Sequence, residues 1–142
     1  MERRRFFTRL GTGTIATLLA VPLMANTLKV LKQRKKGGIL GKEEIQHMVI
    51  FDLHHDKGSE LALKFLNDGQ RILSNISVVN NFQVFNQVSS KNDYTYGFSM
   101  IFSSTSDYDF YTNHPDHVSF VEIRWKKEVT RFQEIDFKPF FK

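Results

Sequence analysis

The sequence contains no cysteine among its 142 residues, and this absence removes several classes of protein from consideration. Without cysteine there are no disulfides, no thiolate metal ligands and no cysteine nucleophile. A lipoprotein-type anchor, which is attached through a cysteine, is excluded as well. Internal repeats and low-complexity tracts are also missing. One small domain with a single core is therefore the expectation for a chain of this length.

Basic charge is scarce outside the N-terminal part of the chain. The whole sequence has a formal net charge of +5 and a pI of about 9.5, values that normally suggest nucleic-acid binding. Ten basic residues and one acidic residue precede position 43, which leaves a net charge of −4 for the remainder. A mildly acidic domain offers no attraction to phosphate backbones, so we expect no nucleic-acid partner.

A hydrophobic run long enough to span a membrane is also lacking. The chain opens with Arg-Arg-Arg-Phe-Phe at residues 3–7, followed by an uncharged, weakly apolar stretch that ends near Ala25. Spanning a bilayer takes about 20 apolar residues, and this stretch is shorter and contains glycine and proline. Paired arginines before a weakly hydrophobic segment are typical of a twin-arginine export signal. We therefore predict a cleaved signal peptide over residues 1–25, an exported (periplasmic or otherwise extracytoplasmic) protein and no membrane span after processing.

A basic linker is predicted over residues 26–42. Its Lys-Gln-Arg-Lys-Lys-Gly-Gly segment combines like charges and flexible glycines without a periodic apolar face. A basic helix lying on a surface around Leu28, Val30 and Leu31 is the alternative. The folded domain is then expected over residues 43–142.

The first half of this domain shows the pattern of a strand followed by a helix. Between residues 45 and 53 both alternating sets of positions are apolar in the middle, which is typical of a strand covered on both faces. A polar turn follows, and Ser59 is suited to cap the next helix. The apolar positions of that helix recur on one face; they are Ala62, Phe65, Leu66, Gly69, Ile72, Leu73 and Ile76.

The second half predicts two strands, an interrupted helix and a final strand. Residues 82–88 are rich in valine and phenylalanine, and residues 94–103 alternate with period two. A helix starts near Ser106, and Pro115 can begin a second helix before a strand over residues 131–137. The order β-α-β-β-α-β predicts an α+β, ferredoxin-like domain with an antiparallel sheet and both helices on one face.

The sheet face without helices needs a cover. Since apolar side chains point to both sides of the strands, a second copy of the sheet is the simplest solution. We therefore predict a homodimer with two-fold symmetry that forms a shared α/β barrel. The aromatic face of Tyr94, Tyr96, Phe98 and Phe102 is then core or barrel lining rather than a platform for stacking nucleobases.

Four segments of the domain carry a resemblance to a known family. Residues 47–51 read His-x-Val-x-Phe, and residues 94–100 form a strand that begins with Tyr-Thr. Residues 111–120 read Tyr-x-x-His-Pro-x-His-x-x-Phe, and residues 135–137 read Ile-Asp-Phe. With these motifs the chain resembles the stress-responsive α/β-barrel (Dabb) family. The resemblance implies a dimeric ferredoxin-like barrel, whereas fold alone does not define a function.

The resemblance also implies candidate catalytic residues. A polyketide cyclase of this family performs aldol chemistry with a tyrosine and a histidine of the helix region, and a strand histidine lines its pocket. The matching residues here are Tyr111, His117 and His47. A further pocket histidine of that enzyme is replaced by Tyr96 in this chain, so the complete set is not kept.

Two interpretations of these histidines remain open. Next to a tyrosine hydroxyl they can move a proton beside a carbonyl, or they can simply satisfy backbone groups near a helix start. We favour a ligand-binding cavity, to which Tyr96, Phe98 and His114 are expected to contribute. His114-x-x-His117 has a spacing that suits a metal, but Pro115 disturbs it, so we expect neither a metal nor a cofactor.

The sequence therefore predicts an exported, stress-associated barrel that forms a homodimer and binds a small hydrophobic or aromatic molecule in each protomer. The alternative is a cofactor-free lyase, cyclase or oxygenase-like enzyme, which Tyr111, His117 and His47 favour. Whether these three side chains face one cavity is the observation that bears most directly on this choice.

Overall fold

The computed structural model describes residues 40–141. The predicted signal peptide at residues 1–25 lies outside these residues, as does the predicted linker up to residue 39. Within residues 40–141, no helix combines the length and the apolar character that crossing a membrane requires.

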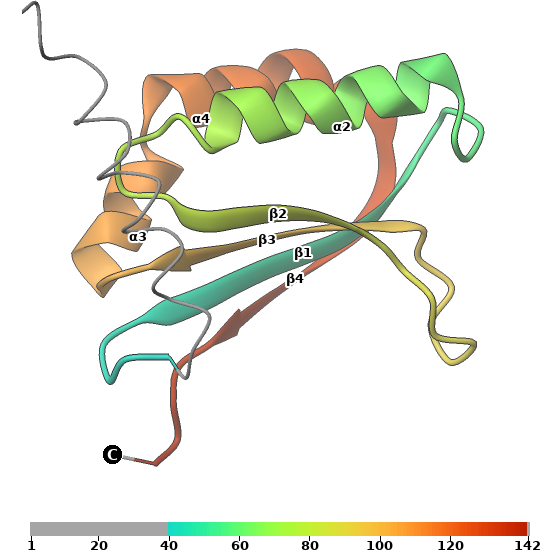
Figure 1. Cartoon of the computed structure of the whole chain (residues 1–142). Coiled ribbons are helices and arrows are strands. Elements are labelled where there is room, and N and C mark those ends of the chain that lie inside the picture. The colour runs from blue at the N-terminus through green and yellow to red at the C-terminus, as the bar shows by residue number, and fades with distance from the viewer. Residues whose placement is uncertain (1–39, 142) are drawn as a thin grey trace, which may run out of the picture.

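The described chain alternates between strands and helices (Figure 1). In chain order the elements are β1 (Ile45–Leu53), α2 (Glu60–Leu73), β2 (Asn80–Asn86), β3 (Tyr96–Phe102), α3 (Thr105–Thr112), α4 (Pro115–Phe120), the π-helical turn η1 (Val121–Trp125), α5 (Lys126–Glu128) and β4 (Val129–Phe137). The predicted break in the second helical region is confirmed, because α3 ends before His114 and α4 begins at Pro115. Strand β4 begins two residues earlier than predicted.

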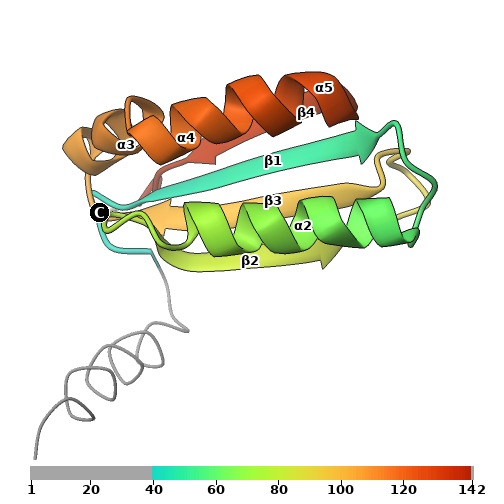
Figure 2. The same ribbon diagram turned by 90° about the horizontal axis from the view of Figure 1, so that it is seen from above.

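The strands form one antiparallel sheet in the order β2-β3-β1-β4. Figure 1 and Figure 2 show the helices on one face of this sheet, with α2 over the β2–β3 side and the segment from α4 to α5 along the β4 side. The predicted ferredoxin-like α+β arrangement is therefore confirmed. Tyr94 is an exception to the predicted aromatic face, because it precedes β3 and lies under the guanidinium of Arg131 at 4.5 Å.

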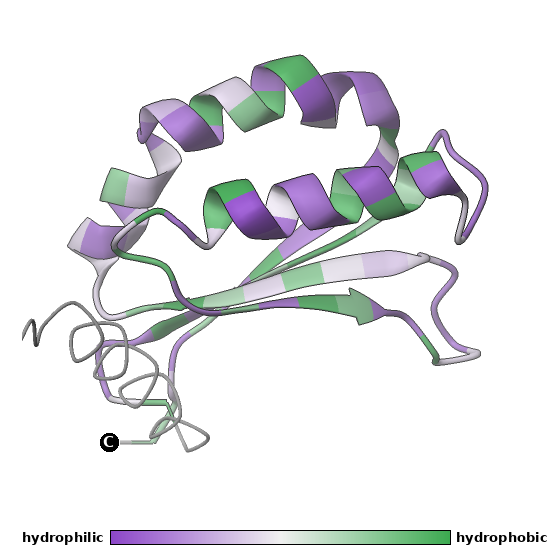
Figure 3. Ribbon diagram, turned by 45° about the horizontal axis from the view of Figure 1, so that its top comes forward, coloured by the Kyte–Doolittle hydropathy of each residue, from purple (hydrophilic) through white to green (hydrophobic). Residues whose placement is uncertain are grey.

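Helix α2 is held in place by its cap and its apolar face. The Ser59 hydroxyl accepts a hydrogen bond from the Ala62 amide at 3.2 Å, as the sequence predicts. Figure 3 shows hydrophobic and hydrophilic residues alternating along this helix, and Phe65, Leu66 and Leu73 are among its buried residues. Because Gly69 has no side chain, the helix approaches closely enough for the Phe98 ring of β3 to pack beneath it.

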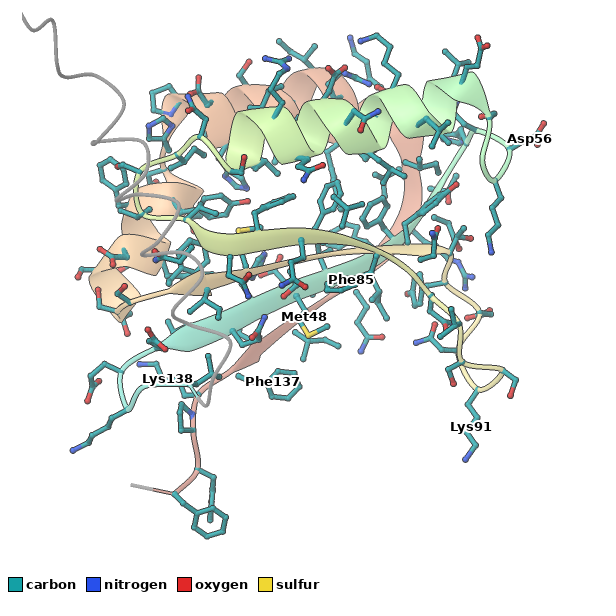
Figure 4. All side chains as sticks on the ribbon, viewed as in Figure 1. Met48, Asp56, Phe85, Lys91, Phe137 and Lys138 are labelled. Carbon is teal, nitrogen blue, oxygen red and sulfur yellow. The ribbon has the colours of Figure 1, made fainter. Side chains whose placement is uncertain are left out.

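Each strand presents one set of side chains to the helices and the other set away from them. On the helix side Phe51 and Phe98 are almost completely buried, with ring centroids 4.9 Å apart. On the opposite side Met48, Phe85 and Phe137 project away from the helices (Figure 4). The strands therefore have two apolar faces, as predicted, and the second face carries aromatic rings that are about half exposed.

Candidate functional site

A cavity of about 330 Å³ lies between the sheet and the helices. Strands β1 and β3 contribute its floor, and α2, α4 and η1 contribute its walls. Its apolar lining includes Val49, Leu73, Phe98, Met100, Phe120 and Trp125. The polar residues that also line it are His47, Tyr111, His117, Lys126 and Glu134. A largely apolar cavity with a few polar groups is the usual form of a small-molecule site.

Tyr111 lies near the end of α3 and is almost completely buried. Its hydroxyl makes no hydrogen bond within the described part of the chain. Burial raises the pKa of Tyr111 well above its ordinary value of 10, and the charge of Glu134 acts in the same direction. The phenol is therefore neutral at physiological pH, and its O–H is available to donate to a bound molecule.

His117 is half-buried in α4, one helical turn before the wall formed by η1. Its Nδ1 lies 3.0 Å from the carbonyl oxygen of Thr112. A carbonyl only accepts, so Nδ1 carries the hydrogen and Nε2 is the basic nitrogen of the neutral ring. Burial lowers the pKa of His117 from 6.5, and the charge of His47 adds to this effect, although the Thr112 hydrogen bond opposes it. The ring is therefore neutral near pH 7, as a general base must be.

His47 lies on β1, directly opposite Asp136 of β4 in the sheet. Its Nδ1 donates to Oδ1 of Asp136 at 2.7 Å, which fixes the tautomer and the plane of the ring. The Tyr108 hydroxyl lies 3.2 Å from the other oxygen of Asp136 and 3.1 Å from Oε1 of Glu134. Burial and the two carboxylates raise the pKa of Tyr108, so this phenol also stays protonated.

The structure brings the three predicted catalytic residues to one cavity. The ring centroids of Tyr111 and His117 are 4.3 Å apart, and those of His47 and Tyr111 are 6.2 Å apart. The residues come from β1, α3 and α4, so they meet only because the helices pack on the sheet. A neutral base beside a phenolic donor is an arrangement that can move a proton at a carbonyl compound.

Of the three predicted ligand-binding residues, only Phe98 lines the cavity. The Tyr96 hydroxyl instead accepts a hydrogen bond from the Gly58 amide at 3.0 Å and ties the turn before α2 to the sheet. Nδ1 of His114 accepts from the Asp116 amide at 3.2 Å and caps α4. His114 therefore satisfies a backbone group at a helix start, which was the alternative interpretation of these histidines.

Sequence reasoning missed Tyr108 and the two carboxylates of β4 as parts of the site. A signal was present, because residues 134 and 136 are two apart on a strand and so share a face. No sequence pattern showed that this face lies next to His47, because that depends on the order of the strands in the sheet.

The ligand atoms of His47, Glu134 and Asp136 lie within 4.8 Å of one another, close enough for a metal ion to bridge them after small adjustments. Trp125 of η1 also lines the cavity.

Comparison with known proteins gives one family. Residues 45–139 match the family model described as Stress responsive A/B Barrel Domain. Among curated proteins, none matches the chain. A Dabb family protein with a ferredoxin-like fold from Mesorhizobium loti is 46% identical, with 68% of this chain and 96% of that chain covered and a TM-score of 0.67.

Two more distant solved structures share the fold alone. A dimeric protein of unknown function from Bacteroides fragilis is 22% identical, with 68% of this chain and 96% of that chain covered and a TM-score of 0.53. The hydroxynitrile lyase from Passiflora edulis is 9% identical, with 72% of this chain and 98% of that chain covered and a TM-score of 0.62. At such identities the likeness concerns the ferredoxin-like fold and not the activity.

Proposed function

The chain belongs to the Dabb (stress responsive A/B barrel) family, and from this premise we propose that it binds a small hydrophobic or aromatic molecule in the cavity of each protomer. The observation that carries the proposal is the combination of an apolar lining with the unpaired hydroxyl of Tyr111. A volume of about 330 Å³ is at the small end of known ligand sites. The preferred ligand is therefore one compact ring or a short branched chain bearing an oxygen that accepts from Tyr111.

Fluorescence titration tests this proposal directly. Trp125 is the only tryptophan of the chain and lines the cavity, so its emission reports on occupancy. The probes are a series of phenols and aromatic aldehydes of increasing size. Val121→Phe adds bulk at the cavity wall, and Val118→Phe makes the same change one turn earlier, at a position that is 45% exposed and does not line the cavity.

The two variants separate cavity binding from surface binding. We expect saturable quenching for wild type and for Val118→Phe, and at least a tenfold weaker response, about 1.4 kcal/mol, for Val121→Phe. Circular dichroism checks that both variants are folded. Equal affinity for all three proteins would show that the probes bind elsewhere, and the proposal would then be wrong.

Acid–base catalysis in the same cavity is the second candidate function, and the contact between the Tyr111 and His117 rings favours it. Nε2 of His117 would take a proton from the carbon next to a substrate carbonyl, while the Tyr111 hydroxyl donates to the oxygen on which negative charge develops. The enolate carbon then attacks a second carbonyl of the same molecule, and the imidazolium returns its proton to the alkoxide that forms. This completes a cofactor-free cyclase reaction, and the reverse sequence breaks the same carbon–carbon bond as a lyase does. The side chains supply base and donor without a redox step, so an oxygenase-like reaction has less support.

Paired measurements on Tyr111→Phe and His117→Ala distinguish catalysis from a structural role. If His117 is the base, His117→Ala should lower turnover of a true substrate by about 10²-fold or more. Its stability should change little, because the Thr112 carbonyl belongs to an exposed residue that water can reach. A loss of about 1–3 kcal/mol of folding free energy with unchanged ligand binding would instead assign a structural role.

We also propose that two protomers pair through the sheet faces that carry no helix. Met48, Phe85 and Phe137 point away from the helices on this face, and the Bacteroides fragilis protein of the same fold is described as dimeric. Met48→Asp would bury an unpaired charge in such an interface and should yield a monomer or an aggregate. Leu61→Asp, at a position 59% exposed on α2, is the matched control and should stay dimeric in light scattering. A monomeric wild type would contradict the proposal.

Export through the twin-arginine route is a proposal that rests on the sequence alone. Arg3 and Arg4 precede a weakly apolar segment, which is the arrangement that this route recognises. Changing both arginines to lysine keeps the charge and should leave unprocessed precursor inside the cell. Cell fractionation measures the result, and undiminished delivery of the double variant would contradict the proposed route.

A further inference from the structure

Two side chains that line the cavity and one beside them form a cluster to which the proton transfer described above gives no role. They are His47 of β1 with Glu134 and Asp136 of β4, and their ligand atoms all lie within 4.8 Å of one another. The His47 side chain is only 8% exposed, so one member of the cluster is fixed in the protein interior. One imidazole with two carboxylates is a donor set that suits divalent transition metals.

The charge of this cluster is not balanced by neighbouring cations. In the described part of the chain, neither Glu134 nor Asp136 has a lysine or arginine nitrogen within 4.0 Å. Lys126 lines the same cavity, but its ammonium group pairs with Glu122. The two carboxylates outnumber the single imidazole, so the cluster has an excess of negative charge that a divalent cation would offset.

The sheet places the three donor residues next to one another before any ion binds. His47 is the direct cross-strand partner of Asp136, and Glu134 is opposite Val49, which also faces the helices. Neighbouring side chains on such a pair of strands have Cβ atoms about 4.5–5.5 Å apart. The Tyr108 hydroxyl, from α3, contacts both carboxylates at 3.1 and 3.2 Å and orients their oxygens. Little ordering is then required when a cation arrives.

We propose that His47, Glu134 and Asp136 form a binding site for one divalent transition-metal ion, such as Zn²⁺ or Mn²⁺, in each protomer. On binding, Nδ1 of His47 gives up its hydrogen and coordinates the ion, while Nε2 carries the hydrogen of the neutral ring, and Asp136 changes from hydrogen-bond acceptor to ligand. Glu134 is exposed, so its side chain can move to complete the set, and water fills the remaining positions. Ca²⁺ and Mg²⁺, which prefer oxygen donors alone, should bind more weakly.

Calorimetric titration of the full, untagged chain with ZnCl₂ and MnCl₂ tests this site. Glu134→Gln removes one ligand charge but keeps the size of the side chain and an oxygen that can accept from Tyr108. The matched control is Asp56→Asn, which makes the same kind of change at an exposed residue of the turn before α2 (Figure 4). We expect one ion per protomer for wild type and Asp56→Asn, and at least about tenfold weaker binding for Glu134→Gln.

Thermal unfolding gives a second, independent readout. The ion should raise the Tm of wild type and Asp56→Asn at a concentration well above Kd, and should raise that of Glu134→Gln much less. No binding by wild type at millimolar Zn²⁺ and Mn²⁺ would overturn the proposal, and so would equal affinity for wild type and Glu134→Gln. The Trp125 titrations with organic probes are carried out in the presence of EDTA, so the failure of one proposal does not affect the other.

Discussion

Gly69 lies in the middle of α2, where its missing side chain has two opposing effects. Helix propensity alone predicts that Gly69→Ala stabilises the protein by about 1 kcal/mol. Tertiary packing predicts the opposite sign. An added Cβ would lie 2.7 Å from Cζ of Phe98 and 3.2 Å from Cζ of Phe120. Since carbon atoms in good contact are about 3.5–4.0 Å apart, the substitution creates a clash.

Neighbouring aromatic rings restrict how far Phe98 can move away from the new methyl group. Its ring is 1% exposed, lies parallel to Phe65 at 6.3 Å and packs against Phe51 at 4.9 Å. Overpacking a dense core costs about 1–3 kcal/mol, and contacts this short correspond to the upper end. After the gain of about 1 kcal/mol from helix propensity, we expect a net loss of about 2 kcal/mol, or a Tm lower by roughly 10 °C for a domain of this size.

The measurement is urea unfolding followed by Trp125 fluorescence, with Gly41→Ala as the control. The Cβ added at Gly41 would meet the Glu44 side chain at 3.4 Å, which is an ordinary contact, so its free energy of unfolding should be nearly unchanged. Phe98 also lines the cavity, so Gly69→Ala should bind the organic probes more weakly. A Gly69→Ala protein as stable as wild type, or more stable, would refute this reasoning, because it would show that Phe98 repacks without cost.

Three further predictions test single interactions. Lys64 and Arg124 hold the pKa of Asp68 well below its usual value of 3.8. The ionised carboxylate therefore stabilises the fold at any pH above 3.8, and this stabilisation is lost as the pH falls from 3.8 through the lowered pKa of the folded state. Urea unfolding should therefore show Asp68→Asn to be less stable than wild type at about pH 6 and closer to it at about pH 2, and a constant difference would contradict this. Ser59→Ala removes the α2 cap and should lower stability by about 1 kcal/mol in thermal unfolding, whereas no change would mean that water replaces the cap. Burial lowers the pKa of His117 from 6.5, so any turnover that uses its free nitrogen should be constant above about pH 7 and should decrease only at acid pH. A turnover that already decreases when the pH is lowered from 9 to about 8 would exclude His117 as the base.

Much of the fold follows from patterns that act over a few residues. Alternation along residues 45–53 predicted β1 with its observed bounds, Ser59 predicted the start of α2, and Pro115 predicted the start of α4. These signals are read correctly because caps, proline geometry and strand alternation depend on local backbone conformation. Tyr94 lies before β3 and not in the predicted strand, and its ring contacts Arg131, which is far away in the chain and which no local pattern predicts.

The candidate site was predictable only in part. His47, Tyr111 and His117 came from the family motifs, and the structure brings all three to one cavity. Tyr96 and His114 do not line the cavity, because each makes a backbone hydrogen bond elsewhere. From the sequence, a histidine that caps a helix and a histidine that faces a cavity look the same, since the difference lies in which way each ring points.

By itself the sequence determined the absence of cysteine chemistry, the basic charge of the N-terminal segment, the order of the elements and the family. Only the tertiary structure decided that His47, which lines the cavity, shares a hydrogen bond with Asp136, which is 89 positions away in the chain. It also decided that Tyr108 contacts both carboxylates of β4 and that Trp125 lines the cavity. The physical reason is that periodicity and capping depend on neighbours along the chain, whereas a cavity and its charge depend on which faces of the sheet and helices meet.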